Sequence, residues 1–452
     1  GTRANYRAVA GVAAALAYAA NPYVVVGGGT TPTLQPYALL PWLVLCWLRG
    51  FRSGAWRWAV LAALALVAMG GVNAGVVPLI QLLVLLPVAL HALLVERARI
   101  GAVVKIVVGS LLGYAVMSAY WLVPALSALT AGRSVAESTE SVQAINMANS
   151  FPEVLRGLGM WTLYGADGAG PFDPGRISYV LSPLVVVLTF GAPVLAGLGV
   201  LLSRHQARVF GAACVLVGAL VMAGPFAGGN SAWGRSMAWA FDTVPGLVAF
   251  RTTNKIGGVL ELGLAVLVAL ASVALAERLV SSFQRLIAVL AATAALLGGM
   301  APALAGELFW IPMDIPKYWT GTAELVNSRN TGSRVMMAPG VGIADYAWGY
   351  SGPDELGPSL FTRPFVYRNS ALSGGLYSAA MLAEVDRRLQ LGTLPAGTMS
   401  TLAAYLGVGD VVGRYDVVDA DLDGARVEKG LDADPGLGAP TVLGADAVSH
   451  GA

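Results

Sequence analysis

The chain has 452 residues, of which 56% are hydrophobic and 12% are charged, and its formal net charge is +2. Soluble domains carry about 25% charged residues, so this balance excludes an ordinary soluble protein and is typical of one that crosses a membrane several times. The small net charge gives no sign of a nucleic-acid partner. Two cysteines inside apolar runs and three scattered histidines provide no Cys/His metal or redox centre.

Nine apolar runs in the first two thirds of the chain predict transmembrane helices, which need about 17–25 such residues. These runs are residues 8–26, 33–48, 57–73, 76–95, 102–127, 177–203, 209–224, 258–276 and 286–305. Between the first two runs, "NPYVVVGGGTTPTLQPY" contains Pro and Gly, so a re-entrant turn is an alternative to two separate helices.

Basic residues recur in every second connection between these runs, which places them all on one side of the membrane. They are Arg3, Arg7, Arg49, Arg52, Arg57, Arg97, Arg99, Lys105, Arg204, Arg208, Arg278 and Arg285. Because positive charge is enriched on the cytoplasmic side, we expect a multi-pass protein of the cytoplasmic membrane. Loops 128–176 and 225–257 and everything after residue 306 then lie outside.

Charged residues divide the chain near residue 306. Residues 307–452 contain 10 basic and 17 acidic side chains, whereas residues 1–306 contain 18 basic and 9 acidic ones. We therefore expect a transmembrane domain over residues 1–306 and an extracytoplasmic domain over residues 307–452. The chain starts at Gly1 without an initiator Met and its tail ends without obvious closure, so we expect a fragment that is trimmed at the start and truncated at the end.

The second domain has the pattern of a mixed α/β fold. "SRVMMAPG" and "VGDVVGRYDVV" predict short buried strands that end in turn residues, and "SAAMLAEVDRRLQLG" predicts a helix that stops at Gly392. The aromatic stretch that follows the first strand contains Trp348, Arg363 and Arg368. Aromatic faces and planar donors suit carbohydrate, and the alternative is an ordered loop that packs on the protein.

The outer loops contain six of the few carboxylates in the transmembrane domain, at Glu137, Glu140, Glu153, Asp167, Asp173 and Asp242. A carboxylate at a membrane surface can deprotonate a sugar hydroxyl, hold a divalent cation against a phosphate, or remain a solvated surface group. Composition does not select among the six or among these roles.

Arg251 and Lys255 in "FRTTNKIGG" close the second outer loop just before a helix, and Arg235 lies upstream. Cations at headgroup depth bind phosphate, and the alternative is membrane anchoring. Glu261 lies about one turn inside the helix. It is either a functional site or part of an internal salt bridge with Lys255 or Arg251.

Several of these stretches, in this order and spacing, make the chain similar to the actinobacterial α-(1→3)-arabinofuranosyltransferases, which are GT-C type membrane glycosyltransferases. The resemblance runs along nearly the whole chain. It is carried by "NPYVVVGGGTTPTLQPYALLPW", "YWLVPAL", "ESVQAINMANSFPEVLRGLGMW", "FRTTNKIGG", "IPKYW", "GSRVMMAPG", "YAWGY", "RPFVYRN" and "LGVGDVVGRYDV".

The resemblance implies a donor of the polyprenyl-phosphate type, decaprenyl-phosphoryl arabinofuranose, and an arabinan acceptor outside the membrane. In the family an Ile-Glu-Ser motif stands thirteen residues before a Glu-Val-Leu-Arg-Gly motif, and Glu140 stands thirteen residues before Glu153 of "EVLRG". Glu140 therefore matches the functional carboxylate, although Thr139 replaces the Ile. Glu153 and Arg156 are expected to shape the loop.

In this scheme Arg251, Lys255 and Arg235 face the departing phosphate. The acceptor contacts Trp161, Trp348, Arg363 and Arg368. No nucleotide-binding pattern occurs, which agrees with a lipid-linked donor. The scheme requires no metal or other cofactor and leaves a divalent cation open.

Two further departures from the family pattern limit what the resemblance implies for this chain. GT-C enzymes usually place a catalytic acid in the first outer loop, and this chain starts after that loop, so the fragment alone is expected to be inactive if the acid is essential. Glu261 has no counterpart in the family pattern. The alternatives are a flippase or transporter of lipid-linked sugars and a non-catalytic scaffold for cell-wall assembly.

Overall fold

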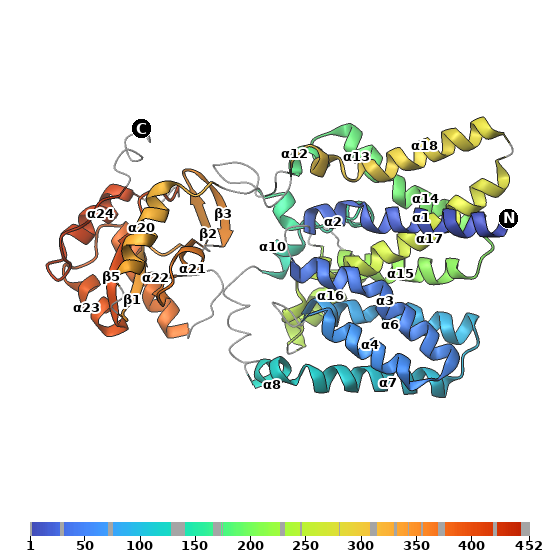
Figure 1. Cartoon of the computed structure of the whole chain (residues 1–452), viewed down its shortest axis with the longest axis horizontal. Helices are drawn as coiled ribbons and strands as arrows, with labels where there is room; N and C mark the ends of the chain where they lie inside the picture. The colour runs from blue at the N-terminus through green and yellow to red at the C-terminus, as the bar shows by residue number, and fades with distance from the viewer. Residues whose placement is uncertain are drawn as a thin grey trace. The chain divides into compact units, whose positions relative to one another are not determined.

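The computed structural model describes residues 2–27, 31–70, 76–127, 141–165, 173, 175–226, 231–244, 246–279, 281–307, 314–329, 332–341, 343–353, 356–368, 376–418 and 423–443. Two compact units share the chain, a helical unit of residues 1–311 and an α/β unit of residues 312–452 (Figure 1).

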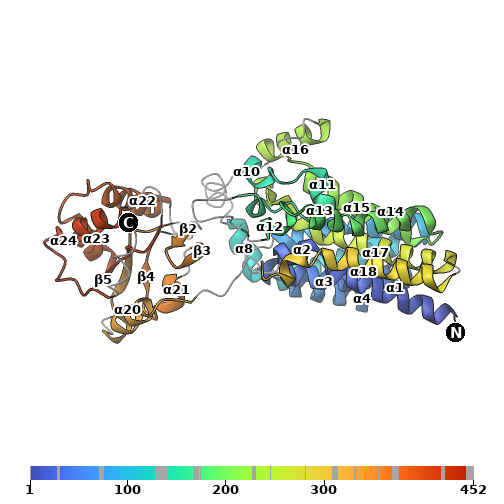
Figure 2. The same ribbon diagram turned by 90° about the horizontal axis from the view of Figure 1, so that it is seen from above.

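All described secondary structure of the helical unit is helical, and its long helices run roughly side by side (Figure 2). Its elements are α1 (Thr2–Ala19), α2 (Pro22–Gly27), α3 (Thr31–Ser53), α4 (Trp56–Ala68), α5 (Val76–Gln81), η1 (Leu82–Val84), α6 (Leu85–Leu90), η2 (His91–Val95), α7 (Ile100–Met117), α8 (Ala119–Ser127), α10 (Val142–Asn146), α11 (Phe151–Leu155), η3 (Trp161–Leu163), α12 (Arg176–Tyr179), α13 (Pro183–Thr189), α14 (Gly191–Leu202), α15 (Ala207–Ala223), α16 (Ala232–Thr243), η4 (Leu247–Phe250), η5 (Thr253–Ile256), α17 (Gly257–Arg278), α18 (Ser282–Gly298) and α19 (Ala301–Leu304).

Each of the nine predicted apolar segments overlaps one or more of these helices. Four helical runs among the described residues are long and apolar enough to cross a membrane: Val76–Val95, Ile100–Met117, Pro183–Leu202 and Thr253–Arg278. Three apolar helices are shorter: Arg7–Ala19, Trp56–Ala68 and Ala207–Ala223. The prediction of a polytopic helical protein is thus supported, and the count of nine membrane crossings stays a prediction.

Asn21 interrupts the first predicted helix. Its amide nitrogen donates hydrogen bonds to the carbonyl oxygens of Ala17 at 3.1 Å and Tyr18 at 2.7 Å. Its side-chain oxygen accepts the backbone N–H of Val24 at 3.0 Å. The Asn21 side chain therefore provides hydrogen-bond partners for carbonyl groups at the end of α1 and for an N–H group at the start of α2. For this reason a short separate helix follows where the apolar pattern predicts one continuous helix.

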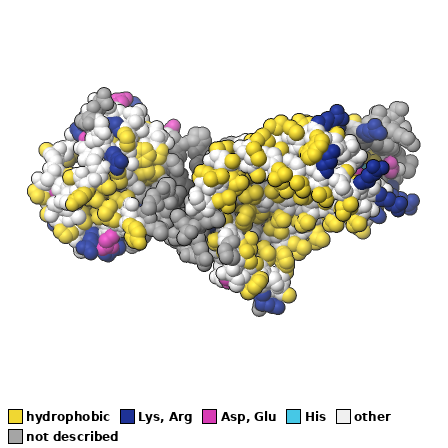
Figure 3. Space-filling model, turned by 90° about the horizontal axis from the view of Figure 1, so that it is seen from below, with side chains coloured by type: hydrophobic (Ala, Val, Ile, Leu, Met, Phe, Trp, Pro, Cys, Tyr) yellow, Lys and Arg dark blue, Asp and Glu magenta, His cyan; other side chains and the backbone are white. Residues whose placement is uncertain are grey.

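The outer surface of the helical unit is apolar. Val116 is 75% exposed and Leu201 is 77% exposed, and Figure 3 shows a broad hydrophobic face with most of its Lys and Arg side chains near one end of this unit. Near the end of α3, Arg52 Nε donates to Glu96 at 2.7 Å, and Lys105 Nζ of α7 donates to the carbonyl oxygen of Gly54 at 2.7 Å. These contacts show that the connection after α3 and the connection before α7 lie together, and the side of the membrane on which they lie stays a prediction.

The α/β unit contains a three-stranded parallel sheet in the order β4-β1-β5 and a separate antiparallel pair, β2 and β3. Its elements are α20 (Lys317–Ser328), β1 (Arg334–Ala338), β2 (Ile343–Tyr346), β3 (Gly349–Pro353), α21 (Leu356–Leu360), β4 (Phe365–Val366), α22 (Leu376–Gln390), α23 (Thr398–Leu406), β5 (Val408–Gly413) and α24 (Gly424–Asp432). The two predicted strands and the predicted helix are present as β1, β5 and α22.

The central strand β1 is buried on both faces. Val335 and Met337 belong to one hydrophobic cluster with Trp319 of α20. The alternate residues, Met336 and Ala338, belong to a second cluster that includes side chains of α22, α23 and α24. Successive strand residues point to opposite faces, so the apolar run of β1 reflects helices on both sides of the sheet.

Candidate functional site

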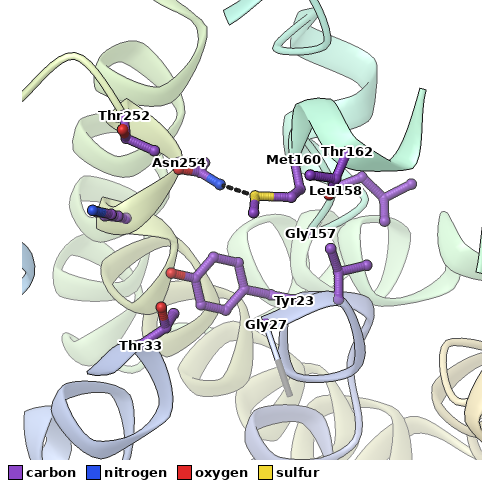
Figure 4. Close-up of a pocket in the computed structure, with 11 residues that line it drawn as sticks. Tyr23, Gly27, Thr33, Gly157, Leu158, Met160, Thr162, Thr252 and Asn254 are labelled. Carbon is purple, nitrogen blue, oxygen red and sulfur yellow. Dashed lines mark hydrogen bonds between the residues drawn. The ribbon is translucent and has the colours of Figure 1, made fainter. Parts of the chain in front are cut away.

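A cavity of about 70 Å³ lies at the meeting point of α2, the start of α3 and two segments from distant parts of the sequence (Figure 4). The distant segments are residues 157–162, which follow α11, and residues 252–255, which lead into α17. The residues that line the cavity are Tyr23, Val26, Gly27, Thr33, Gly157, Leu158, Met160, Thr162, Thr252, Asn254 and Lys255.

Buried polar side chains join the two distant segments. Asn146 Nδ2 donates to the carbonyl oxygen of Arg251 at 2.8 Å, and its Oδ1 accepts from Thr253 Oγ1 at 2.8 Å. Asn149 Nδ2 donates to Thr253 Oγ1 at 3.2 Å and to the carbonyl oxygen of Met222 at 2.9 Å. Both asparagines are fully buried. The loop motif "ESVQAINMANSFPEVLRGLGMW" and the motif "FRTTNKIGG" therefore form one structure.

Arg156 fixes the next turn of the loop. Its side chain is buried, and it donates to Glu153 at 2.6 Å, to Thr189 Oγ1 at 2.8 Å and to the carbonyl oxygen of Tyr179 at 2.6 Å. Its guanidinium also lies 5.5 Å from the centre of the Phe190 ring. The prediction that Glu153 and Arg156 shape the loop is confirmed by these contacts.

Glu261 lies directly behind the cavity wall. Its side chain is buried, and a Cβ atom at Gly157 would lie 2.6 Å from Glu261 Oε1. Only glycine fits there, and its φ of +77° is also one that favours glycine. Glu261 forms no ion pair with any described cation, so the internal salt bridge with Lys255 or Arg251 considered above is absent.

The predicted phosphate-binding residues differ in whether they line the cavity. Lys255 lines it, and Arg251 belongs to the segment that Asn146 binds. Arg235 is exposed on α16 and is not among the lining residues. Glu140 and Glu137 lie outside the described residues, which resume at Ser141, the N-cap of α10. Trp161 begins η3, next to the lining residue Thr162.

In the α/β unit the predicted acceptor residues have different surroundings. Arg363 is buried, and its guanidinium donates to Asp410 at 2.7 Å and to the carbonyl oxygens of Val326 at 2.9 Å and Ser333 at 3.1 Å. Its guanidinium is therefore occupied inside the unit. Arg368 is exposed, two residues after β4.

Trp348 contributes to a cluster around one carboxylate oxygen. Oδ2 of Asp416 accepts hydrogen bonds from Trp348 Nε1 at 2.8 Å, Trp319 Nε1 at 2.7 Å and Tyr318 Oη at 2.9 Å. The Trp348 ring also stacks on Tyr346 at 4.6 Å between ring centres. Three of the motifs named above, "IPKYW", "YAWGY" and the end of "LGVGDVVGRYDV", thus meet at one structural contact.

Sequence reasoning missed Tyr23, Thr162 and Asn254 as cavity residues. Tyr23 lies within "NPYVVVGGG" and Asn254 within "FRTTNKIGG". The motifs that carry the family resemblance therefore include two of these residues, although nothing in the sequence distinguishes them from their neighbours. Among the described residues no group of three His, Cys, Asp or Glu side chains is placed to hold a metal ion.

A family described as "Alpha-(1->3)-arabinofuranosyltransferase, N-terminal GT-C domain" matches residues 5–450. The chain belongs to this family. The expected resemblance is therefore confirmed over nearly the whole chain, and the match includes both the helical unit and the α/β unit.

The similar proteins are much longer than this chain. An α-(1→3)-arabinofuranosyltransferase of Mycobacterium tuberculosis (strain ATCC 25618 / H37Rv) is 26% identical over 467 residues, which cover 96% of this chain and 32% of that protein. The cryo-EM structure of arabinofuranosyltransferase AftD from Mycobacteria matches with a TM-score of 0.64 and 21% identity, covering 96% of this chain and 30% of that one. A mutant form matches with a TM-score of 0.63 and 20% identity, covering 96% and 31%. This likeness establishes the fold, and the chain spans about a third of these proteins.

Proposed function

We propose that this chain is the membrane part of an enzyme that transfers arabinofuranose from a polyprenyl-phosphate donor, decaprenyl-phosphoryl arabinofuranose, to cell-wall arabinan. The observation that carries the proposal is the joint between the Glu140 loop and the Lys255 segment, made by Asn146, Asn149 and Thr253. This joint holds a cavity with Lys255 on its wall, and Glu140 directly precedes, in sequence, the described part of the loop that forms the joint.

The chemistry requires one bond to form and one to break. An oxygen of the acceptor hydroxyl attacks the anomeric carbon of the donor, the bond between that carbon and the phosphate oxygen breaks, and polyprenyl phosphate leaves. The proton of the attacking hydroxyl passes to the Glu140 carboxylate, which acts as general base. Lys255 and Arg251 stabilise the negative charge that develops on the leaving phosphate.

The membrane supplies the donor, and the acceptor arrives from outside the cell. The lipid tail of the donor lies among the helices, in contact with the apolar surface described above. Trp161, next to the lining residue Thr162, is the proposed acceptor contact in the helical unit, and the exposed Arg368 is the proposed one in the α/β unit. A divalent cation at the phosphate is left open.

The test measures transfer from labelled decaprenyl-phosphoryl arabinofuranose to a synthetic arabinan by the full-length parent protein in membranes. Glu140→Gln is expected to lower transfer by about 10²-fold or more, because a positioned general base contributes about 10²–10⁴-fold. Glu137→Gln, three residues away in the same loop, is the matched control and should retain transfer. Equal transfer by the wild type and Glu140→Gln would remove Glu140 from the mechanism. Transfer by none of the three would favour a flippase or a scaffold.

A further inference from the structure

Three polar side-chain atoms around the cavity have no hydrogen-bond partner in the described part of the protein: Tyr23 Oη, Thr162 Oγ1 and Asn254 Oδ1. Tyr23 is 6% exposed and Thr162 is 8% exposed. A buried polar group without a partner destabilises the folded protein, so three around one cavity indicate that something polar fills it.

The shape and chemistry of the lining favour a carbohydrate ring. Val26, Leu158 and Met160 provide apolar surface, which suits the C–H faces of a sugar, whereas the two hydroxyls and the amide suit its hydroxyl groups. Figure 4 shows the Tyr23 hydroxyl pointing into the space between Asn254 and Thr33. Within the described segments the acceptor for Asn254 Nδ2 is a sulfur atom, Met160 Sδ at 3.0 Å, so its amide also gains from a polar ligand.

The size of the cavity agrees with one small ring. A volume of about 70 Å³ is several times the minimum of about 10–15 Å³ that admits one water molecule, so the cavity has room for a group of several atoms. A polyprenyl tail would leave the three polar atoms without partners. A bare phosphate would need more cationic lining than Lys255, the one charged residue among those that line the cavity.

We infer that this cavity binds the sugar ring of the lipid-phosphate donor, and that Tyr23, Thr162 and Asn254 select it by hydrogen bonds to its hydroxyl groups. The inference rests on the proposed function and adds the residues that distinguish the sugar. Lys255 on the same wall puts the donor phosphate next to the ring. A donor without the ring leaves these polar atoms unpaired, so the site discriminates against it.

The experiment compares the binding of two ligands to the full-length parent protein in lipid nanodiscs, decaprenyl-phosphoryl arabinofuranose and decaprenyl phosphate. Tyr23→Phe and Thr162→Val each remove one hydroxyl with little change of shape. Each is expected to reduce the preference for the sugar-bearing lipid by about three- to tenfold, because a net hydrogen bond contributes about 0.5–1.5 kcal/mol. Affinity for decaprenyl phosphate should not change.

Tyr114→Phe is the matched control. Tyr114 is also a buried tyrosine, but it lies on α7 and does not line the cavity, so this variant should keep the wild-type preference. Equal weakening of the binding of both ligands by Tyr23→Phe and Thr162→Val would overturn the inference. A wild-type protein that shows no preference, because water alone fills the cavity, would also overturn it.

Transfer measured in parallel separates this inference from the proposed function. Transfer that survives without sugar preference leaves the function standing and removes this site, whereas the absence of both transfer and preference removes both.

Discussion

At the scale of single residues, several charged side chains of the α/β unit are buried and have hydrogen-bond partners inside it. Arg363 pairs with Asp410, and Arg414 Nε donates to the carbonyl oxygen of Pro339 at 3.0 Å. Asp386, on α22, is buried and accepts the backbone N–H of Gly340 at 2.9 Å. Burial raises the pKa of the Asp386 carboxyl to about 7, against the opposing effects of the Gly340 hydrogen bond and of Arg368 and Arg414. This group therefore links the stability of the unit to pH.

Asp386→Asn is expected to remove that pH dependence. In the folded protein Asp386 keeps its proton up to about pH 7, whereas in the unfolded chain an Asp loses it near about pH 4. Between these values the folded state binds more protons, so stability falls as pH rises, by at most about 1.4 kcal/mol per pH unit. Hydrogen exchange of α22 and β1 in the full chain, corrected for the intrinsic exchange rate, should show falling protection from pH 5 to pH 7 in the wild type and a flatter profile in the variant.

The exposed Asp432 on α24 supplies the control, because Asp432→Asn should leave the wild-type pH profile unchanged. Protection of β1 that rises with pH in the wild type would contradict the prediction.

At the scale of elements, α17 is the centre of the helical unit and packs against α1, α14 and α15. Glycines bring these helices close. A Cβ atom at Gly199 of α14 would lie 2.1 Å from the carbonyl oxygen of Leu267 in α17, and one at Gly263 of α17 would lie 2.7 Å from the carbonyl oxygen of Gly211 in α15. Small residues at helix crossings allow backbones to approach in membrane proteins. The same helix α17 begins at the cavity, so its position also sets the site.

Gly199→Ala is expected to destabilise the protein by about 1–3 kcal/mol, because the methyl group meets backbone atoms that cannot move aside. Gly197→Ala, on the same helix, meets nothing within 4 Å, so it should be neutral or stabilise by up to about 1 kcal/mol. Thermal unfolding of the two variants and the wild type in detergent measures the difference. Equal melting temperatures for all three would show that α14 and α17 are not in close contact.

At the scale of the whole molecule, the apolar exterior and the basic end of the helical unit agree with a protein embedded in a membrane with that end in the cytoplasm. The connection that contains His205 belongs to the basic end, whereas Ser231, the exposed N-cap of α16, belongs to the second predicted outer loop. Cys46 and Cys214 are both buried, which keeps background reactivity of the native thiols low.

Cysteine labelling of the full-length parent in intact cells tests this orientation. Ser231→Cys should react with a membrane-impermeant maleimide from outside, and His205→Cys should react only after the cells are opened. The reverse pattern would invert the proposed topology and place the Glu140 loop in the cytoplasm, where an extracellular arabinan acceptor cannot reach it.

The sequence by itself determined the apolar helices, the strands β1 and β5, the helix α22 and the family, because hydropathy, periodicity and ordered motifs are local properties of a chain. Only the tertiary structure decided which residues meet. It joined Asn146 and Asn149 to Thr253, more than one hundred positions away, and it engaged Arg363 with Asp410 in the interior. It also gathered Tyr23, Thr162 and Asn254 around one cavity, because hydrogen bonds between distant segments depend on how the helices pack.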